Sequence, residues 1–298
     1  MVEPATIEAH ASHVNRVLFS PDGQTLLSAG MDAAIRLWKA PGWSAAGELG
    51  GHEKSVNDLA FTPDGSHLVS GSTDGAVIVR TFPGDDVVAS FRAHKKAVAA
   101  VAVAPDGKGL ATASYDATVR LWTLPGGEEA ATLRGHPRNV TCLAYARGGE
   151  VLLSGGAGDE LFVWDPAAGE EVERLDGHRG AVMSLALAPD GGTLASSGYE
   201  GAVRLWSTAG WGLEREIDLG VKGQLPLAWA PDGDLLAVGS ERKVALYRPA
   251  DGEPVAETEV DAKGVYSLAF SPDGRHLAAA SADKRVRVWE VAALTAGS

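Results

Sequence analysis

The sequence predicts an all-β protein assembled from about seven copies of one four-stranded unit. Five histidines recur at intervals of 42 residues, namely His10, His52, His94, His136 and His178. A Pro-Asp-Gly turn recurs six times and ends at Gly23, Gly65, Gly107, Gly191, Gly233 and Gly274. Short segments of alternating apolar residues lie between these landmarks. A fixed period of this length is the signature of a repeat architecture.

The unit that begins at His94 shows why each segment is expected to form a strand. The first strand, "AVAAVAV", alternates small apolar residues and ends in the turn "APDG", where proline presets φ and glycine tolerates a positive φ. The second strand is "GLATAS", and the dipeptide "YD" makes a tight reversal into the third, "ATVRLW". The turn "TLPGGEE" then leads to the fourth strand, "AATLRGH". No segment of the chain shows a helical period.

These recurring landmarks resemble the WD40 repeat, and the resemblance extends over nearly the whole chain. It implies a seven-bladed β-propeller with four antiparallel strands in each blade and a central channel. The expected repeats are residues 10–51, 52–93, 94–135, 136–177, 178–219, 220–260 and 261–290, the last completed by residues 5–9. We therefore expect residues 1–298 to form a single domain.

The two ends of the chain predict how the ring closes. The segment "PATIEAH" matches the fourth strands that precede the other repeats, whereas the last repeat ends soon after its third strand, "RVRVWE". We expect residues 5–9 to pair with residues 286–289, because that third strand would otherwise be an exposed apolar edge. Ile7 should point into this sheet, and the tail "LTAGS" should be dispensable.

The resemblance also implies a hydrogen-bonded tetrad in each blade. In the family, the tetrad joins the repeat's histidine, a Ser or Thr on the second strand, an Asp in the next turn and a Trp on the third strand. Two repeats carry all four residue types: His10, Ser28, Asp32 and Trp38, and His94, Thr112, Asp116 and Trp122. We interpret these residues as structural, because buried polar groups need partners.

The other repeats depart from the tetrad pattern. Arg80 replaces the Trp of the second repeat, Gly158 the Asp of the fourth and Glu200 the Asp of the fifth. The sixth repeat has Gly220, Glu241 and Tyr247 in place of His, Asp and Trp, and the seventh has Asp261 in place of His. We therefore expect apolar packing, more than tetrads, to hold the fold together.

No group of residues predicts catalysis, a metal or a cofactor. The repeat histidines fall on different blades, no Cys or His pair has zinc spacing, and the glycines lie in turns. Cys142 lies in the apolar segment "VTCLAY" and is expected to be a packing residue. We expect a non-enzymatic protein that has no metal and no cofactor.

Charge and composition narrow the classes of partner. The formal net charge of −13 argues against nucleic-acid binding by the surface as a whole. No apolar run has membrane-spanning length, and the N-terminal segment does not resemble a signal peptide. One cysteine allows no internal disulfide, which suits a reducing compartment. We expect a monomeric cytoplasmic protein with no membrane or nucleic-acid partner.

Basic residues gather in the loops between the repeat histidine and the following strand. They are Lys54, Lys95, Lys96, Arg138, Arg179, Lys222 and Lys263. In a propeller these loops share one face with the Asp turns. The acid-rich loops, such as those with Asp85, Asp86 and Glu170, fall on the opposite face. Ordinary polar loops would also carry charges, but the regular positions of these basic residues favour a basic rim.

Apolar and amide side chains are expected beside this rim. Met31, Tyr115 and Tyr199 precede the Asp position, and Asn15, Asn57, Thr141, Met183 and Tyr266 should line the channel mouth. Together the two sets suggest a scaffold or recognition module that docks a protein or peptide, for which an acidic partner is one option, on the basic face. The alternatives are a propeller enzyme, or a small-molecule- or phosphate-binding protein that uses the channel mouth.

Overall fold

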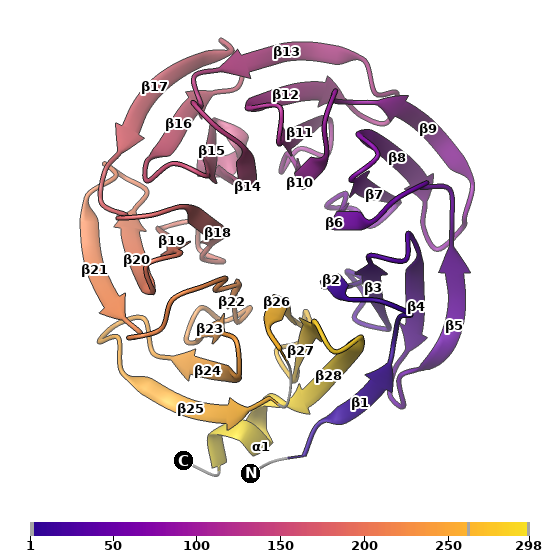
Figure 1. The fold of residues 1–298 in the computed structure, drawn as a ribbon, viewed down its shortest axis with the longest axis vertical. Coiled ribbons are helices and arrows are strands. Elements are labelled where there is room, and N and C mark those ends of the chain that lie inside the picture. Colours follow the sequence, from indigo (N-terminus) through magenta and orange to yellow (C-terminus); the bar gives the residue numbers. More distant parts are fainter. Residues whose placement is uncertain (1–2, 261–262, 297–298) are drawn as a thin grey trace.

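The computed structural model describes residues 3–260 and 263–296, which form a ring of seven four-stranded antiparallel sheets (Figure 1). In each sheet the strands follow one another in hydrogen-bonding order from the centre of the ring to its circumference. This is a seven-bladed β-propeller with four antiparallel strands per blade. The predicted fold class is therefore confirmed.

The first four blades follow the repeats in chain order. Blade 1 comprises β2 (Val14–Phe19), β3 (Thr25–Gly30), β4 (Ile35–Lys39) and β5 (Ser44–Leu49). Blade 2 comprises β6 (Val56–Phe61), β7 (His67–Ser72), β8 (Ala76–Thr81) and β9 (Val87–Arg92). Blade 3 comprises β10 (Val98–Val103), β11 (Gly109–Ser114), β12 (Thr118–Thr123) and β13 (Glu129–Arg134). Blade 4 comprises β14 (Val140–Ala146), β15 (Val151–Gly156), β16 (Leu161–Asp165) and β17 (Glu170–Leu175).

The last three blades complete the ring. Blade 5 comprises β18 (Val182–Leu187), β19 (Thr193–Gly198), β20 (Ala202–Ser207) and β21 (Leu213–Asp218). Blade 6 has shorter inner strands and comprises β22 (Leu227–Trp229), β23 (Leu236–Gly239), β24 (Lys243–Tyr247) and β25 (Pro254–Glu259). Blade 7 comprises β26 (Val265–Phe270), β27 (His276–Ser281), β28 (Arg285–Glu290) and, as its outer strand, β1 (Ala5–Glu8).

The N-terminal strand closes the ring. β1 pairs antiparallel with β28, with Ala5 opposite Val288 and Ile7 opposite Val286. Ile7 packs against a buried cluster that contains Val286 and Val288. The two ends of the chain therefore meet at one blade, as Figure 1 shows. β28 consequently has a hydrogen-bonded neighbour on each side.

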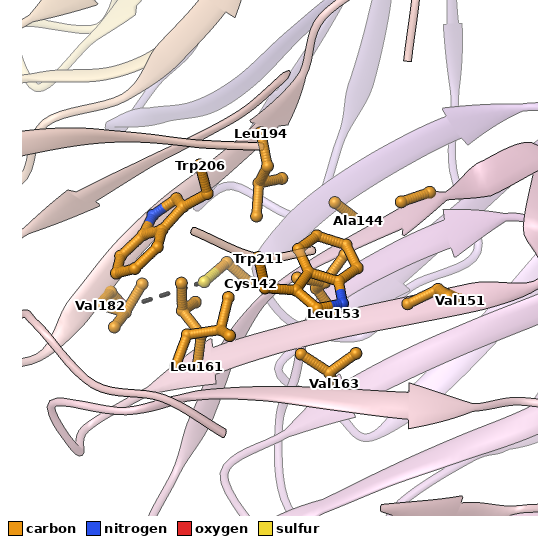
Figure 2. Close-up of a cluster of buried hydrophobic side chains, with 12 residues drawn as sticks. Cys142, Ala144, Val151, Leu153, Leu161, Val163, Val182, Leu194, Trp206 and Trp211 are labelled. Carbon is orange, nitrogen blue, oxygen red and sulfur yellow. Dashed lines mark hydrogen bonds between the residues drawn. The ribbon is translucent and has the colours of Figure 1, made fainter. Parts of the chain in front are cut away.

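The core consists of apolar side chains packed between neighbouring blades. Figure 2 shows one such cluster, in which Trp206 and Trp211 of blade 5 meet Cys142 and Leu161 of blade 4. The Cys142 thiol lies 3.8 Å from the carbonyl oxygen of Val182, and burial raises its pKa to about 12. Cys142 is thus a protonated packing residue. Apolar side chains packed between neighbouring blades, as in this cluster, stabilise the ring.

Two short helical segments differ from the expectation that the chain has none. A 3₁₀ turn, η1 (Arg147–Gly149), follows β14, and α1 (Val291–Ala296) packs against β25 and β28. Leu294 of α1 is buried in the cluster of blades 6 and 7, so we now expect removal of Leu294 to cost stability, contrary to the prediction that trimming the tail is silent. Six residues are too few to establish a helical period in the sequence. None of the described helices is long and apolar enough to cross a membrane.

Candidate partner-binding face

The loops that carry the basic residues and the turns that carry the tetrad acids lie on the same face. Backbone hydrogen bonds join them in blades 1, 3 and 5: Met31 N–H to His13 O at 2.9 Å, Tyr115 N–H to Ala97 O at 3.1 Å, and Tyr199 N–H to Ala181 O at 2.8 Å. In each case the residue before the tetrad acid is tied to the residue that leads into the inner strand. Met31, Tyr115 and Tyr199 therefore stand on the face that carries the basic loops.

Seven basic side chains stand in the loops that lead into blades 2 to 7 on this face, and we call them the basic rim. They are Lys54, Lys95, Lys96, Arg138, Arg179, Lys222 and Lys263, and all seven are exposed. None of them forms an ion pair with another residue in the described part of the chain. Their charges are therefore available to a partner, subject only to screening by salt.

A hollow of about 340 Å³ opens at the centre of the face, and we call it the channel mouth. It is lined by Asn15, Met31, Asn57, Ala99, Tyr115, Thr141, Met183, Gln224 and Tyr266. Met31 and Tyr115 are 48% and 43% exposed, so part of each side chain is presented to solvent. Tyr199 is 53% exposed but does not line this hollow. The structure thus brings the residues expected at the mouth together and leaves Tyr199 outside it.

Three of the mouth residues use their polar atoms to join neighbouring blades. Asn15 Nδ2 donates to Val56 O at 2.9 Å, and Asn57 Nδ2 donates to Val98 O at 2.7 Å. Thr141 Oγ1 donates to Val182 O at 3.0 Å. These groups are occupied in the closed ring, so the side chains best placed to contact a partner are Met31, Tyr115, Met183 and Tyr266.

An ion pair lies deeper in the channel. Arg16 Nε is 2.9 Å from Asp58 Oδ1, and Asp58 also accepts a hydrogen bond from the Val101 N–H at 2.9 Å. Burial raises the pKa of Asp58 above its ordinary value, although Arg16 opposes the shift. The sequence pattern did not predict this pair, although Arg16 directly follows Asn15 and Asp58 directly follows Asn57.

Two protein-family models match the chain. The model described as the WDHD1 first WD40 domain matches residues 50–296, and the model described as the WD domain, G-beta repeat, matches residues 2–39. The chain belongs to the WD40-repeat family. WD40 propellers are commonly scaffolds for protein interaction. No curated protein matches the chain in a sequence search.

The WD40 tetrads connect the loops of the basic face to its turns. In blade 1, His10 Nε2 is 2.8 Å from Ser28 Oγ, His10 Nδ1 is 2.8 Å from Asp32, and Trp38 Nε1 donates to Ser28 Oγ at 2.9 Å. Asp32 also accepts a hydrogen bond from the Ala11 N–H at 2.9 Å. The tetrad therefore fixes the loop against the turn.

Blade 3 has the same network. His94 contacts Asp116 at 3.0 Å and Thr112 at 2.7 Å, and Trp122 donates to Thr112 at 2.9 Å. Burial lowers the pKa of His94 despite the neighbouring carboxylate, so this histidine is neutral at physiological pH.

Two departures from the WD40 pattern are compensated by other contacts. In blade 5, Glu200 lies 2.7 Å from His178 Nδ1 and 2.7 Å from Arg204, so glutamate fills the place of the usual aspartate. In blade 2, Arg80 occupies the tryptophan position and pairs with Asp85 at 2.5 Å.

Blade 4 lacks the carboxylate. His136 bonds Ser154 at 2.6 Å, but the Phe162 ring packs on it with centroids 3.9 Å apart, and burial lowers the pKa of His136 to about 4.

Within the described residues, no group of three His, Cys, Asp or Glu side chains is arranged to hold a metal ion. Asp261, which the sequence places at the histidine position of the seventh repeat, lies outside the described residues.

Proposed function

We propose that this WD40 propeller is a non-enzymatic scaffold that docks a protein or peptide on the basic rim around the channel mouth. One observation supports the proposal above all: in the loops into blades 2 to 7, exposed basic side chains without ion-pair partners among the described residues stand around a hollow that presents Met and Tyr side chains. Amphipathic aromatic and Met side chains at the centre, with charges around them, are the usual composition of a protein-binding hot spot.

Charge indicates the kind of partner. The chain carries a formal charge of −13, yet the seven rim residues are basic and form no ion pair within residues 3–260 and 263–296. An acidic partner would be steered to this face and repelled from the rest of the surface. We further propose that the protein is monomeric and cytoplasmic, since its single cysteine is buried and protonated and requires no oxidising compartment.

Charge reversal tests the docking face. The variant Lys54→Glu/Lys96→Glu/Arg138→Glu should lose the partners that wild-type protein captures from its native host. Its melting temperature should stay nearly unchanged, because exposed substitutions typically alter stability by no more than about 0.5 kcal/mol each.

The matched control reverses three exposed acids that lie in or beside the connections between third and fourth strands. The control variant is Asp86→Lys/Glu170→Lys/Glu253→Lys, and it should retain the captured partners. Equal capture by wild-type protein and by the rim variant would refute the proposed docking face.

A salt series separates peptide recognition from polyanion binding, because the rim would also attract phosphate-rich polymers. Affinity for a polyanion falls steeply with salt in proportion to the number of phosphates neutralised. A partner anchored by the apolar mouth should keep most of its affinity. A steep, purely electrostatic salt dependence would favour the phosphate-binding alternative.

A further inference from the structure

The missing histidine of the sixth repeat changes how one loop of the basic face is held. In blade 3, His94 ties the incoming loop to Asp116 of the same blade. The corresponding position before blade 6 is Gly220, so no imidazole ties this loop to its own blade. Leu219 N–H donates to Gly201 O of blade 5 at 2.9 Å, much as His94 N–H donates to Gly75 O of blade 2 at 3.0 Å. Farther along the loop, Gly223 N–H also donates to Tyr199 O of blade 5 at 3.0 Å.

This arrangement brings the backbone segments of two exposed apolar residues, Tyr199 and Val221, close to each other outside the channel mouth. A Cβ atom at Gly201, whose φ is +102°, would lie 2.0 Å from the carbonyl oxygen of Val221, so only glycine allows the two backbones to approach this closely. Tyr199 and Val221 are 53% and 44% exposed. We call these two residues the outer patch. Two of the four large apolar side chains most exposed on the basic face therefore lie at the junction of blades 5 and 6.

The outer patch is continuous with the channel mouth. The loop that carries Val221 reaches the hollow three residues later, at Gln224, and three residues span at most about 10 Å. On the blade 5 side, the Tyr199 N–H bonds to Ala181 O, two residues before Met183, which lines the hollow. A bound chain could therefore contact both places without leaving the surface.

Two exposed basic residues flank the outer patch. Arg179 and Lys222 are rim residues on the two loops beside it. The Glu200 carboxylate contacts both His178 and Arg204 at 2.7 Å. Asp218, the nearest acid on the loop, accepts a hydrogen bond from the Gly220 N–H at 2.9 Å and stays an exposed negative charge. The positive charge that would attract an acidic ligand therefore comes from Arg179 and Lys222 together with the rest of the basic rim.

We infer that the partner is an extended acidic peptide segment with two apolar anchors, one in the channel mouth and one on the outer patch. This inference rests on the proposed docking function. In an extended chain, successive side chains point to opposite faces, so every second side chain lies on the same face. Each residue advances the chain by about 3.3 Å. Anchors at positions i and i+4, roughly 13 Å apart, lie on one face of such a chain and span the at most about 10 Å between Val221 and Gln224.

The test uses defined synthetic peptides. Fluorescein-labelled polyglutamate peptides carry one phenylalanine, two at i and i+4, or two at i and i+3, and binding is measured by fluorescence polarisation. The i,i+4 peptide should bind wild-type protein at least about ten-fold more tightly than the single-phenylalanine peptide, because the second anchor binds intramolecularly. The i,i+3 peptide should show little of this gain.

Two variants locate the second anchor. Tyr199→Ser/Val221→Ser should reduce the affinity of the i,i+4 peptide to that of the single-phenylalanine peptide, whose own affinity should not change. Val87→Ser/Val172→Ser removes two equally exposed valines from outer strands and should change neither. Melting temperatures of both variants should match the wild type, since all four side chains are exposed.

The outcomes separate this inference from the proposed function. If the single-phenylalanine peptide binds wild-type protein but not the rim variant, and the second phenylalanine adds nothing, the docking face stands and the two-anchor geometry is wrong. A gain that persists in Tyr199→Ser/Val221→Ser, or is equal at i,i+3, also refutes that geometry. If no glutamate peptide prefers wild-type protein to the rim variant, both proposals fail.

Discussion

Restoring the missing carboxylate of blade 4, by Gly158→Asp, should stabilise the protein and reduce its sensitivity to acid. The backbone at this position is already in the tetrad register, because Ala157 N–H bonds Asn139 O at 2.8 Å as Tyr115 N–H bonds Ala97 O in blade 3. A Cβ atom at Gly158 would meet no atom within 4 Å. The new side chain therefore has room to reach His136.

The magnitude follows from the pKa of His136. This pKa falls from an ordinary value of 6.5 to about 4 on folding, since burial disfavours the charged ring. The unfolded chain binds the extra proton below pH 6.5, so the contribution to stability is complete above pH 6.5 and is lost as the pH falls toward 4. Between pH 7 and pH 5 the loss amounts to about 2 kcal/mol.

An aspartate at position 158 would raise the pKa of His136 toward its ordinary value and remove part of that loss. A hydrogen bond to a charged group contributes about 1.5–3 kcal/mol. Phe162 stands where blades 1, 3, 5 and 7 have an arginine, so the carboxylate would have fewer partners. We expect stabilisation of about 1 kcal/mol at pH 7 and about 2 kcal/mol at pH 5.

Urea unfolding at the two pH values measures this difference, and NMR titration of the His136 ring measures its pKa directly. The control is Gly158→Ala, which restricts the unfolded backbone without adding a carboxylate and should shift stability equally at both pH values. An unchanged pKa of His136, or equal effects of Gly158→Asp at pH 7 and pH 5, would refute the reasoning.

Three further predictions concern stability. Asp116→Ala should cost about 1–3 kcal/mol in urea unfolding because it leaves buried tetrad groups unpaired, whereas Asp159→Ala, an exposed residue one place out of register, should cost less than about 0.5 kcal/mol; comparable costs would contradict the register. Deleting residues 1–9 should expose β28 and cause aggregation or a large fall in melting temperature, and a monomeric deletion mutant with wild-type stability would rule this out. Leu294→Ala should cost about 2 kcal/mol, and no measurable cost would show that α1 does not pack in solution.

The sequence predicts the ring, its strands and the pairing of its two ends because each repeat carries its own turn and alternation signals. It does not predict which side chains meet inside the channel. In blades 1 to 5 and in blade 7, the pairing between the innermost strand and its neighbour has a register irregularity just after the first valine, such as that between Val14 and Arg16. A bulge of this kind re-aims side chains, so strict alternation does not show that Arg16 would meet Asp58.

Compensation across blades was equally hidden in the sequence. Arg80 stands at a tryptophan position, and only the fold shows that its guanidinium donates to the carbonyl oxygen of Gly50, which follows the outer strand of blade 1. From the sequence, Gly220 indicates only that the sixth repeat has lost its histidine. In the fold, the loop that contains Gly220 is bonded to Tyr199 of blade 5 through the Gly223 N–H. Such substitutions take their meaning from residues that lie far away in the chain or on another blade.

The closure of the ring also has a consequence for synthesis on the ribosome. Glu8 of β1 and its partner Arg285, 2.7 Å apart in the folded ring, are separated by 277 positions in the chain. At translation rates of about 5–20 residues per second, β1 must wait roughly 15–55 seconds for its partner strand. During that time the strand is an unpaired edge in a crowded solution. Glu8 of the strand and the two residues before it, Glu3 and Pro4, are of the types that discourage pairing with other chains. The composition in and beside β1 thus protects this strand until β28 has been made.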